Sequence, residues 1–154
     1  MKKILFVCLG NICRSPMAEI FMKELLNRKG ISEKFHVDSV GTSDEESGNG
    51  VYPPVRDLLE SKGISVPKRC ARQICERDFE EADYIIAMDA SNQKNLYRRF
   101  GEKKPVYLLL DFADRPGESV ADPWYTRDFE QAYRDVQAGC MGLFEYLKEK
   151  EQVR

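Results

Sequence analysis

Short, almost wholly apolar runs alternate along the chain with longer segments whose apolar residues recur at helical spacing. A mixed apolar and polar segment over residues 35–40 is a further predicted strand, and the apolar runs themselves cover residues 3–7, 84–88 and 106–110. Their length and composition are typical of strands buried on both faces of a parallel sheet. The sequence therefore predicts an α/β fold, a four-stranded parallel sheet with helices on both faces, right-handed crossovers and a flavodoxin-like, doubly wound architecture.

Proline and glycine mark the limits of the predicted helices. Pro16 suits the first turn of a helix over residues 16–29, and Gly30 suits its end. The same reasoning predicts helices over residues 54–62, 91–100 and 128–150, and loops over residues 43–50 and 111–126. Residues 1–154 fit a single domain, because the sequence contains no repeat, linker or low-complexity tract.

Composition excludes several classes of protein. A net charge of −2 gives no basic surface for nucleic acid, and no apolar run approaches the ~18 residues of a membrane span. The N-terminus does not read as a signal peptide, so a cytoplasmic location is expected. Five cysteines without a CxxC pair, and a single histidine, His36, argue against a disulfide framework and a structural zinc site. We interpret His36, within a strand, as a packing residue.

Candidate functional residues fall where strands end. Cys8 follows the first predicted strand, Ser39 and Gly41 lie at the end of the second, and the loop over residues 111–126 leaves the fourth. Ligands of open parallel sheets bind outside the carboxyl ends of the strands. These three segments are therefore expected to meet at one edge of the sheet.

The loop from Cys8 to Arg14 has the properties of an anion site. Its backbone N–H groups can surround an anion, and the following helix adds the positive end of its dipole. Arg14 can donate two parallel hydrogen bonds to a phosphate-like group, and Gly10 permits an unusual backbone conformation. Such surroundings lower a cysteine pKa from ~8.5 to ~3.5–7.5. Cys8 is therefore a candidate nucleophile at neutral pH.

A leaving oxygen needs an acid to protonate it, and His36 is poorly placed for that role. Asp122, in the sequence "VADPWYT", is the candidate acid. Pro123 stiffens the backbone after it, and Trp124 and Tyr125 add aromatic surface beside it. A plain Asp-Pro turn with the aromatic residues packed on the core is the alternative.

These segments together resemble the low-molecular-weight protein tyrosine phosphatase family. The resemblance covers nearly the whole chain and rests on "VCLGNICRSPMAE", "DSVGTSD", "ARQI", "DYIIAMDASN" and "ADPWY". It implies that Cys8 is the nucleophile, Arg14 binds phosphate and Asp122 is the general acid. It also implies a phosphate-binding loop made of Leu9, Gly10, Asn11, Ile12, Cys13, Arg14 and Ser15, with Asn11, Ser15 and Ser39 supporting its shape.

The resemblance further implies a reaction in two steps. Cys8 attacks phosphorus to form a cysteinyl-phosphate, and Asp122 then activates the water that hydrolyses it. No metal or cofactor is expected. The expected partner is a phosphotyrosine-containing protein or peptide, with inorganic phosphate or vanadate as inhibitors, and no nucleic acid or membrane span is involved.

Substrate preference is predicted from position 12. A related subgroup of arginine phosphatases carries threonine there, whereas Ile12 matches the tyrosine-directed members and would line a flat slot with Leu9, Trp124 and Tyr125. A protein-arginine phosphatase of the same family is the first alternative function. The second alternative is a thioredoxin-coupled arsenate reductase that relays a disulfide through Cys70 and Cys75. The third is a phosphate-binding module without catalytic activity. Intact Cys8 and Asp122 count against a pure binding module.

Three further residues are singled out. Cys13 is expected to protect Cys8 against over-oxidation by forming a reversible disulfide with it. Many family members carry a histidine at the position of Arg69. The resemblance assigns to that histidine hydrogen bonds that support the phosphate-binding loop from behind. The family often has an aromatic residue in one wall of the pocket where this chain has acidic residues, and Tyr52 is the candidate substitute.

Overall fold

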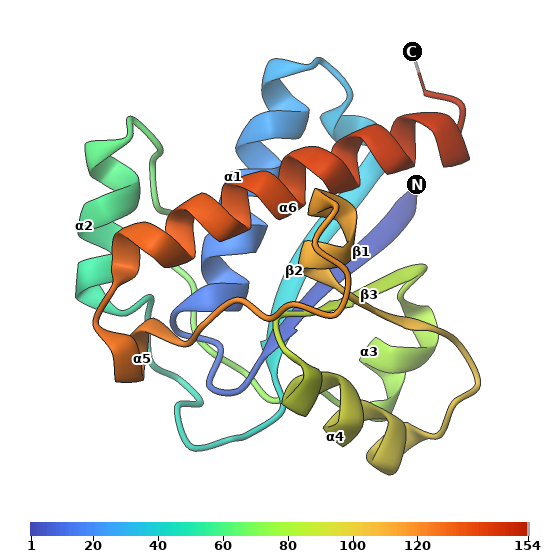
Figure 1. Cartoon of the computed structure of the whole chain (residues 1–154), viewed down its shortest axis with the longest axis horizontal. Helices are drawn as coiled ribbons and strands as arrows, with labels where there is room; N and C mark the ends of the chain where they lie inside the picture. The colour runs from blue at the N-terminus through green and yellow to red at the C-terminus, as the bar shows by residue number, and fades with distance from the viewer. Residues whose placement is uncertain (154) are drawn as a thin grey trace.

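The structure, a computed structural model, describes residues 1–153 (Figure 1). Its strands are β1 (Lys2–Cys8), β2 (Phe35–Gly41), β3 (Tyr84–Ala87) and β4 (Val106–Leu108). Its α-helices are α1 (Arg14–Arg28), α2 (Pro53–Ser61), α3 (Glu76–Glu81), α4 (Ala90–Phe100), α5 (Pro123–Thr126) and α6 (Phe129–Lys150). Two 3₁₀ helices, η1 (Ser32–Lys34) and η2 (Leu109–Ala113), complete the set.

All pairings in the sheet are parallel, and the strand order is β2-β1-β3-β4. This is the flavodoxin-like order, so the predicted fold class is confirmed. The register pairs Cys8 with Gly41, which brings the carboxyl ends of β1 and β2 level with each other. Two of the three segments that were expected at this edge therefore meet there.

Side chains of the central strand β1 alternate between two cores. Ile4 and Phe6 belong to the core under α1, α2 and α6, whereas Leu5 and Val7 belong to the core under α3 and α4. Figure 1 shows these two groups of helices on opposite sides of the sheet. Burial on both faces explains why the central strands β1 and β3 are continuous apolar runs, whereas the edge strand β2 mixes apolar and polar residues.

The loop after β1 approaches the end of β2 very closely. A Cβ atom at Gly41 would lie 2.7 Å from the carbonyl oxygen of Leu9, a distance that real Cβ atoms do not tolerate. The close approach lets the backbone N–H of Thr42 donate to the Cys8 carbonyl and that of Ser43 to the Leu9 carbonyl. Gly41 thus allows the two segments to be joined side by side.

The structure corrects several sequence-based expectations. Helix α3 was not predicted, because its six residues carry one buried apolar side chain, Phe79, and so show no helical periodicity. The fourth strand ends at Leu108 instead of residue 110, and the predicted loop over residues 111–126 contains the end of η2 and all of α5. His36 is exposed on the edge strand β2, so its interpretation as a packing residue is wrong.

The other element boundaries differ from the predictions by one or two residues. A search of the described helices for an apolar segment long enough to cross a membrane finds none.

Candidate active site

The thiol of Cys8 lies at the carboxyl end of β1, at the start of a tight loop that leads into α1. Its Sγ atom accepts a hydrogen bond from the backbone N–H of Asn11 at 3.3 Å and lies 3.0 Å from Ser15 Oγ. Helix α1 begins at Arg14, so the positive end of its dipole is directed at the same loop. Donors and dipole together favour negative charge at this position.

Asn11 has a backbone φ of 61°, in the left-handed region that non-glycine residues rarely adopt. Its side chain is fully buried and holds this conformation in place. The Nδ2 atom donates to Ser15 Oγ at 2.8 Å and to Ser39 Oγ at 3.0 Å. Hydrogen bonds to two serine hydroxyls therefore hold the strained backbone of Asn11 in place, and such strain persists only where the surrounding structure fixes it.

Arg69 completes this network from the far side. Its Nη2 atom donates to Asn11 Oδ1 at 2.7 Å, and its Nε lies 3.5 Å from the buried carboxylate of Glu19. Glu19 in turn accepts a hydrogen bond from Ser39 Oγ at 2.6 Å. Arg69 thus contacts the loop from the position where the resemblance expected histidine, and Glu19 balances its charge.

Arg14 is 2% exposed and joins three segments of the chain. Its Nη1 atom donates to Asp89 Oδ2 at 2.7 Å and to the Val120 carbonyl at 2.9 Å, and its Nη2 lies 3.3 Å from Asp122 Oδ2. Burial alone would lower the pKa of Arg14, but Cys8 and the two carboxylates together raise it above its usual value. The guanidinium therefore stays charged.

One atom of Arg14 remains available to a ligand. The Nε atom is buried and finds no hydrogen-bond partner within residues 1–153. Buried polar atoms in proteins are nearly always paired, so an unpaired donor in a pocket calls for an explanation. An oxyanion seated above Cys8 would supply the missing acceptor.

Asp122 is the N-cap of the short helix α5. Its Oδ1 atom accepts a hydrogen bond from the backbone N–H of Trp124 at 3.0 Å, which leaves Oδ2 facing Arg14. The cap orients the carboxyl group, and Pro123 at the first helical position fixes the backbone that follows. Asp122 and Cys8 therefore line the same pocket although they are 114 residues apart in the sequence.

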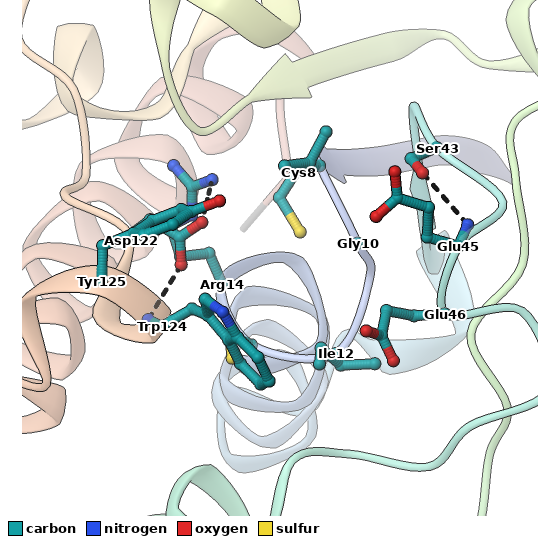
Figure 2. A pocket seen from close by; sticks show the side chains of 12 residues that line it. Cys8, Gly10, Ile12, Arg14, Ser43, Glu45, Glu46, Asp122, Trp124 and Tyr125 are labelled. Carbon is teal, nitrogen blue, oxygen red and sulfur yellow. Dashed lines mark hydrogen bonds and ion pairs between the residues drawn. The ribbon is translucent and has the colours of Figure 1, made fainter.

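A pocket of about 160 Å³ opens above the Cys8 sulfur. Figure 2 shows the sulfur pointing into this space, with Asp122, Trp124 and Tyr125 on one wall and Ser43, Glu45 and Glu46 on the other. The remaining lining residues come from the loop after β1: Leu9, Gly10, Ile12, Cys13 and Arg14. One wall is therefore aromatic and the other is acidic.

All four residues predicted for the substrate slot, Leu9, Ile12, Trp124 and Tyr125, line this pocket. Tyr52 does not line it within the described chain, so its expected place in the opposite wall is wrong. The ring of Tyr52 instead lies behind Trp124, with ring centroids 4.9 Å apart. Cys70 and Cys75 also lie outside the pocket lining, as the described residues define it.

Sequence reasoning missed two residues of the site, Asp89 and Glu19. Asp89 was not singled out, although its place two residues after the end of β3, ahead of the predicted helix, marks it as a residue of the same sheet edge. Glu19 was also missed, because one acidic residue in a helix gives no sign that it is buried. Its burial depends on Ser39 and Arg69, which are distant in sequence.

The thiol of Cys13 faces the same pocket as Cys8 and is buried. Burial, together with the nearby Cys8 and Asp122, raises the pKa of Cys13 to about 12. Cys13 is therefore a neutral thiol at physiological pH. Of the two loop cysteines, only Cys8 combines an N–H donor, a nearby hydroxyl and the helix dipole.

Comparison with known proteins identifies the family of the chain. The family model described as low molecular weight phosphotyrosine protein phosphatase matches residues 3–153. The low molecular weight protein-tyrosine-phosphatase YfkJ of Bacillus subtilis is 39% identical over 99% of this chain and 100% of its own length. The human low molecular weight phosphotyrosine protein phosphatase is 37% identical over 94% of each chain. The chain belongs to the low molecular weight phosphotyrosine protein phosphatase family.

Solved structures extend the comparison to the fold. The crystal structure of YfkJ matches with a TM-score of 0.93 and covers 98% of this chain and 97% of its own. The crystal structure of DARP, a Drosophila arginine phosphatase, is 31% identical and matches with a TM-score of 0.88, covering 96% of this chain and 98% of its own. Proteins named for phosphotyrosine and for arginine phosphatase activity thus share this architecture.

Proposed function

We propose that the chain hydrolyses phosphotyrosine in proteins or peptides through a cysteinyl-phosphate on Cys8. The observation that carries this proposal is a single pocket that holds the Cys8 sulfur at its floor and Arg14 and Asp122 at its side. Nucleophile, phosphate ligand and proton donor are the three groups that such a reaction requires. Relatives named as tyrosine phosphatases support the choice of substrate.

In the first step the Cys8 thiolate attacks phosphorus, and the bond from phosphorus to the phenolic oxygen breaks. Asp122 Oδ2 donates its proton to the departing oxygen, so tyrosine leaves neutral. In the second step Asp122, now ionised, takes a proton from a water molecule that attacks the cysteinyl-phosphate. Inorganic phosphate is released, and Cys8 and the protonated Asp122 are restored.

The loop stabilises the charge that develops during both steps. Arg14 offers its unpaired Nε and a permanently charged guanidinium, and the dipole of α1 points at the phosphoryl oxygens. The network of Asn11, Ser15 and Ser39 holds these donors in position before substrate binds. Such preorganised groups lower a barrier without reorganising during the reaction.

The acidic wall gives a reason to keep one second candidate, hydrolysis of phosphoarginine. Glu45 and Glu46 line the pocket opposite Trp124 and offer carboxylates that a guanidinium could pair with. The aromatic wall and the apolar side chain of Ile12 favour the phenyl ring of phosphotyrosine instead. Initial rates on phosphotyrosine, phosphoserine and phosphoarginine peptides distinguish the candidates, and we expect the phosphotyrosine peptide to be fastest.

Replacement of Ile12 by threonine is expected to shift this preference toward phosphoarginine. The change removes apolar area from the slot and adds a hydroxyl, so the discrimination should fall by ~1–2 kcal/mol, about 5-fold to 30-fold. The measurement is the ratio of kcat/KM for the two peptides. Ile12→Val, which loses area but adds no hydroxyl, is the matched control. An unchanged ratio in Ile12→Thr would mean that position 12 does not select the substrate.

Cys13 is expected to make the oxidation of Cys8 reversible. Peroxide converts the Cys8 thiolate to a sulfenic acid, and the Cys13 thiol condenses with it to a disulfide with loss of water. Because the pKa of Cys13 is raised to about 12, Cys13 is not itself the first target of peroxide. After peroxide and then dithiothreitol, the wild-type protein should recover most activity and Cys13→Ser much less.

The matched control for this experiment is Cys70→Ser, since Cys70 is exposed and outside the pocket lining. It should recover as the wild type does. Equal recovery of Cys13→Ser and wild type would assign Cys13 to packing alone.

A further inference from the structure

Tyr52 lies at the junction of the two segments that bear the proposed catalytic groups. Its backbone N–H donates to the Ile12 carbonyl at 3.0 Å, which ties it to the loop around Cys8. Its ring centroid lies 4.9 Å from that of Trp124 and 6.0 Å from that of Phe129. It therefore touches the phosphate-binding loop through its backbone and the segment around Asp122 through its side chain.

Arg127 adds a second link between Tyr52 and the Asp122 segment. Its Nη2 atom donates to the Tyr52 hydroxyl at 3.0 Å, and its guanidinium lies over the rings of Tyr52 and Phe129. The Nη1 atom of the same side chain donates to the Trp124 carbonyl at 3.4 Å. Arg127 thus links the C-terminal end of α5 to the side chain of Tyr52. Cation–π attraction to the Tyr52 ring adds to the hydrogen bonds of this link.

Helix α5 is short, and Pro123 is its one buried residue. It has only four residues, and its two aromatic side chains are 44% (Trp124) and 74% (Tyr125) exposed. The contact between Asp122 and Arg14 at 3.3 Å would weaken when a phosphoryl group accepts hydrogen bonds from the same guanidinium. The packing behind Trp124 is then a further contact that can fix the position of Asp122.

We propose that Tyr52 is a positioning residue that holds the Asp122 carboxyl over the leaving oxygen by packing against Trp124 and accepting the Arg127 hydrogen bond. The inference rests on the proposed function, because it assumes that Asp122 is the proton donor. Tyr52 itself contacts no reacting atom. Its link to Ile12 is made by the backbone N–H, which every residue except proline supplies, so the substitutions tested below act on the acid segment and spare the phosphate-binding loop.

The first test compares leaving groups in Tyr52→Leu. Loss of acid positioning harms a substrate whose leaving group is a strong base and spares one whose leaving group is a weak base. We expect kcat/KM to fall ~10-fold to 100-fold for a phosphotyrosine peptide, the scale of a misplaced catalytic group, and less than ~3-fold for nitrophenyl phosphate. The constant for inhibition by inorganic phosphate should stay unchanged, because Cys8 and Arg14 are untouched.

The second test observes the packing directly. Trp124 is the only tryptophan in the chain, so intrinsic fluorescence reports on this site alone. In Tyr52→Leu the emission should be quenched more readily by iodide and its anisotropy should fall. Tyr52→Phe keeps the ring and loses only the hydroxyl that Arg127 binds, so it should show a smaller change in both tests. It also serves as the readout if Tyr52→Leu does not fold.

Combination with Asp122→Asn completes the design. Once the proton donor is gone, adding Tyr52→Leu should cost no further activity on the phosphotyrosine peptide, since the two changes remove one function. Equal losses on both substrates, additive losses in the double variant, or unchanged Trp124 fluorescence would each overturn the positioning role. Failure of wild type to hydrolyse the peptide, or of Asp122→Asn to depend on the leaving group, would instead overturn the proposed function.

Discussion

Cys8→Ser is expected to have no measurable phosphatase activity, a loss of at least ~10⁴-fold, as found where other covalent enzymes lose their nucleophile. Serine is close to cysteine in size and can keep the contacts to Asn11 and Ser15. A hydroxyl is not ionised at neutral pH and needs an adjacent base, and the described pocket supplies no histidine for that purpose. The loss should therefore appear in turnover while the folded structure is retained.

Three measurements separate loss of chemistry from loss of fold. Thermal unfolding of Cys8→Ser should stay close to that of the wild type, and binding of inorganic phosphate should persist because Arg14 and the helix dipole remain. Cys70→Ser, a change of the same type at an exposed cysteine, should be fully active. Turnover by Cys8→Ser within tenfold of wild type would show that another group attacks phosphorus.

Asp122→Asn is expected to lose ~10²–10⁴-fold on phosphotyrosine, because the proton donor to the phenolic oxygen is gone. The loss should shrink on nitrophenyl phosphate, whose leaving group departs without a proton. Asparagine is as good an N-cap as aspartate, so the hydrogen bond from the Trp124 N–H and the fold of α5 should persist. The measurement is kcat/KM for the two substrates in both proteins.

Vanadate affinity provides the internal check on this variant. Asp122→Asn removes a carboxylate that competes for Arg14, so vanadate should bind at least as tightly as to wild type. Asp57→Asn, the same change at an exposed aspartate in α2, should behave as wild type in every assay. Unchanged rates of Asp122→Asn on phosphotyrosine would mean that another residue is the acid.

The fold could be predicted from the sequence because burial on both faces of the sheet leaves a strong signal. The runs around Phe6 and Ile86 are apolar without alternation, and glycines such as Gly30 and Gly101 mark the helix ends. Elements with a weak signal were missed. Helix α3 buries one side chain, and α5 is a single turn inside a loop, so neither shows a period that could be read.

The site was predictable where chemistry and spacing lie within one segment, as from Cys8 to Ser15. Contacts between distant segments could not be read in the same way. Tyr52 was assigned to the pocket wall because it is the aromatic residue nearest to the acidic loop in sequence, whereas the start of α2 directs its ring behind Trp124. Arg69 reaches Asn11 across 58 residues, a contact that only the folded chain defines.

The most direct test of this account is to identify the covalent intermediate. The Asp122→Asn variant should form the cysteinyl-phosphate from nitrophenyl phosphate, because this leaving group departs without a proton donor. It should hydrolyse the intermediate slowly, because the base that activates water is missing. Quenching the reaction and analysing the peptides by mass spectrometry should place one phosphoryl group on Cys8. A phosphoryl group on any other residue would contradict a mechanism through Cys8. A burst of nitrophenol with no phosphorylated peptide would contradict it as well.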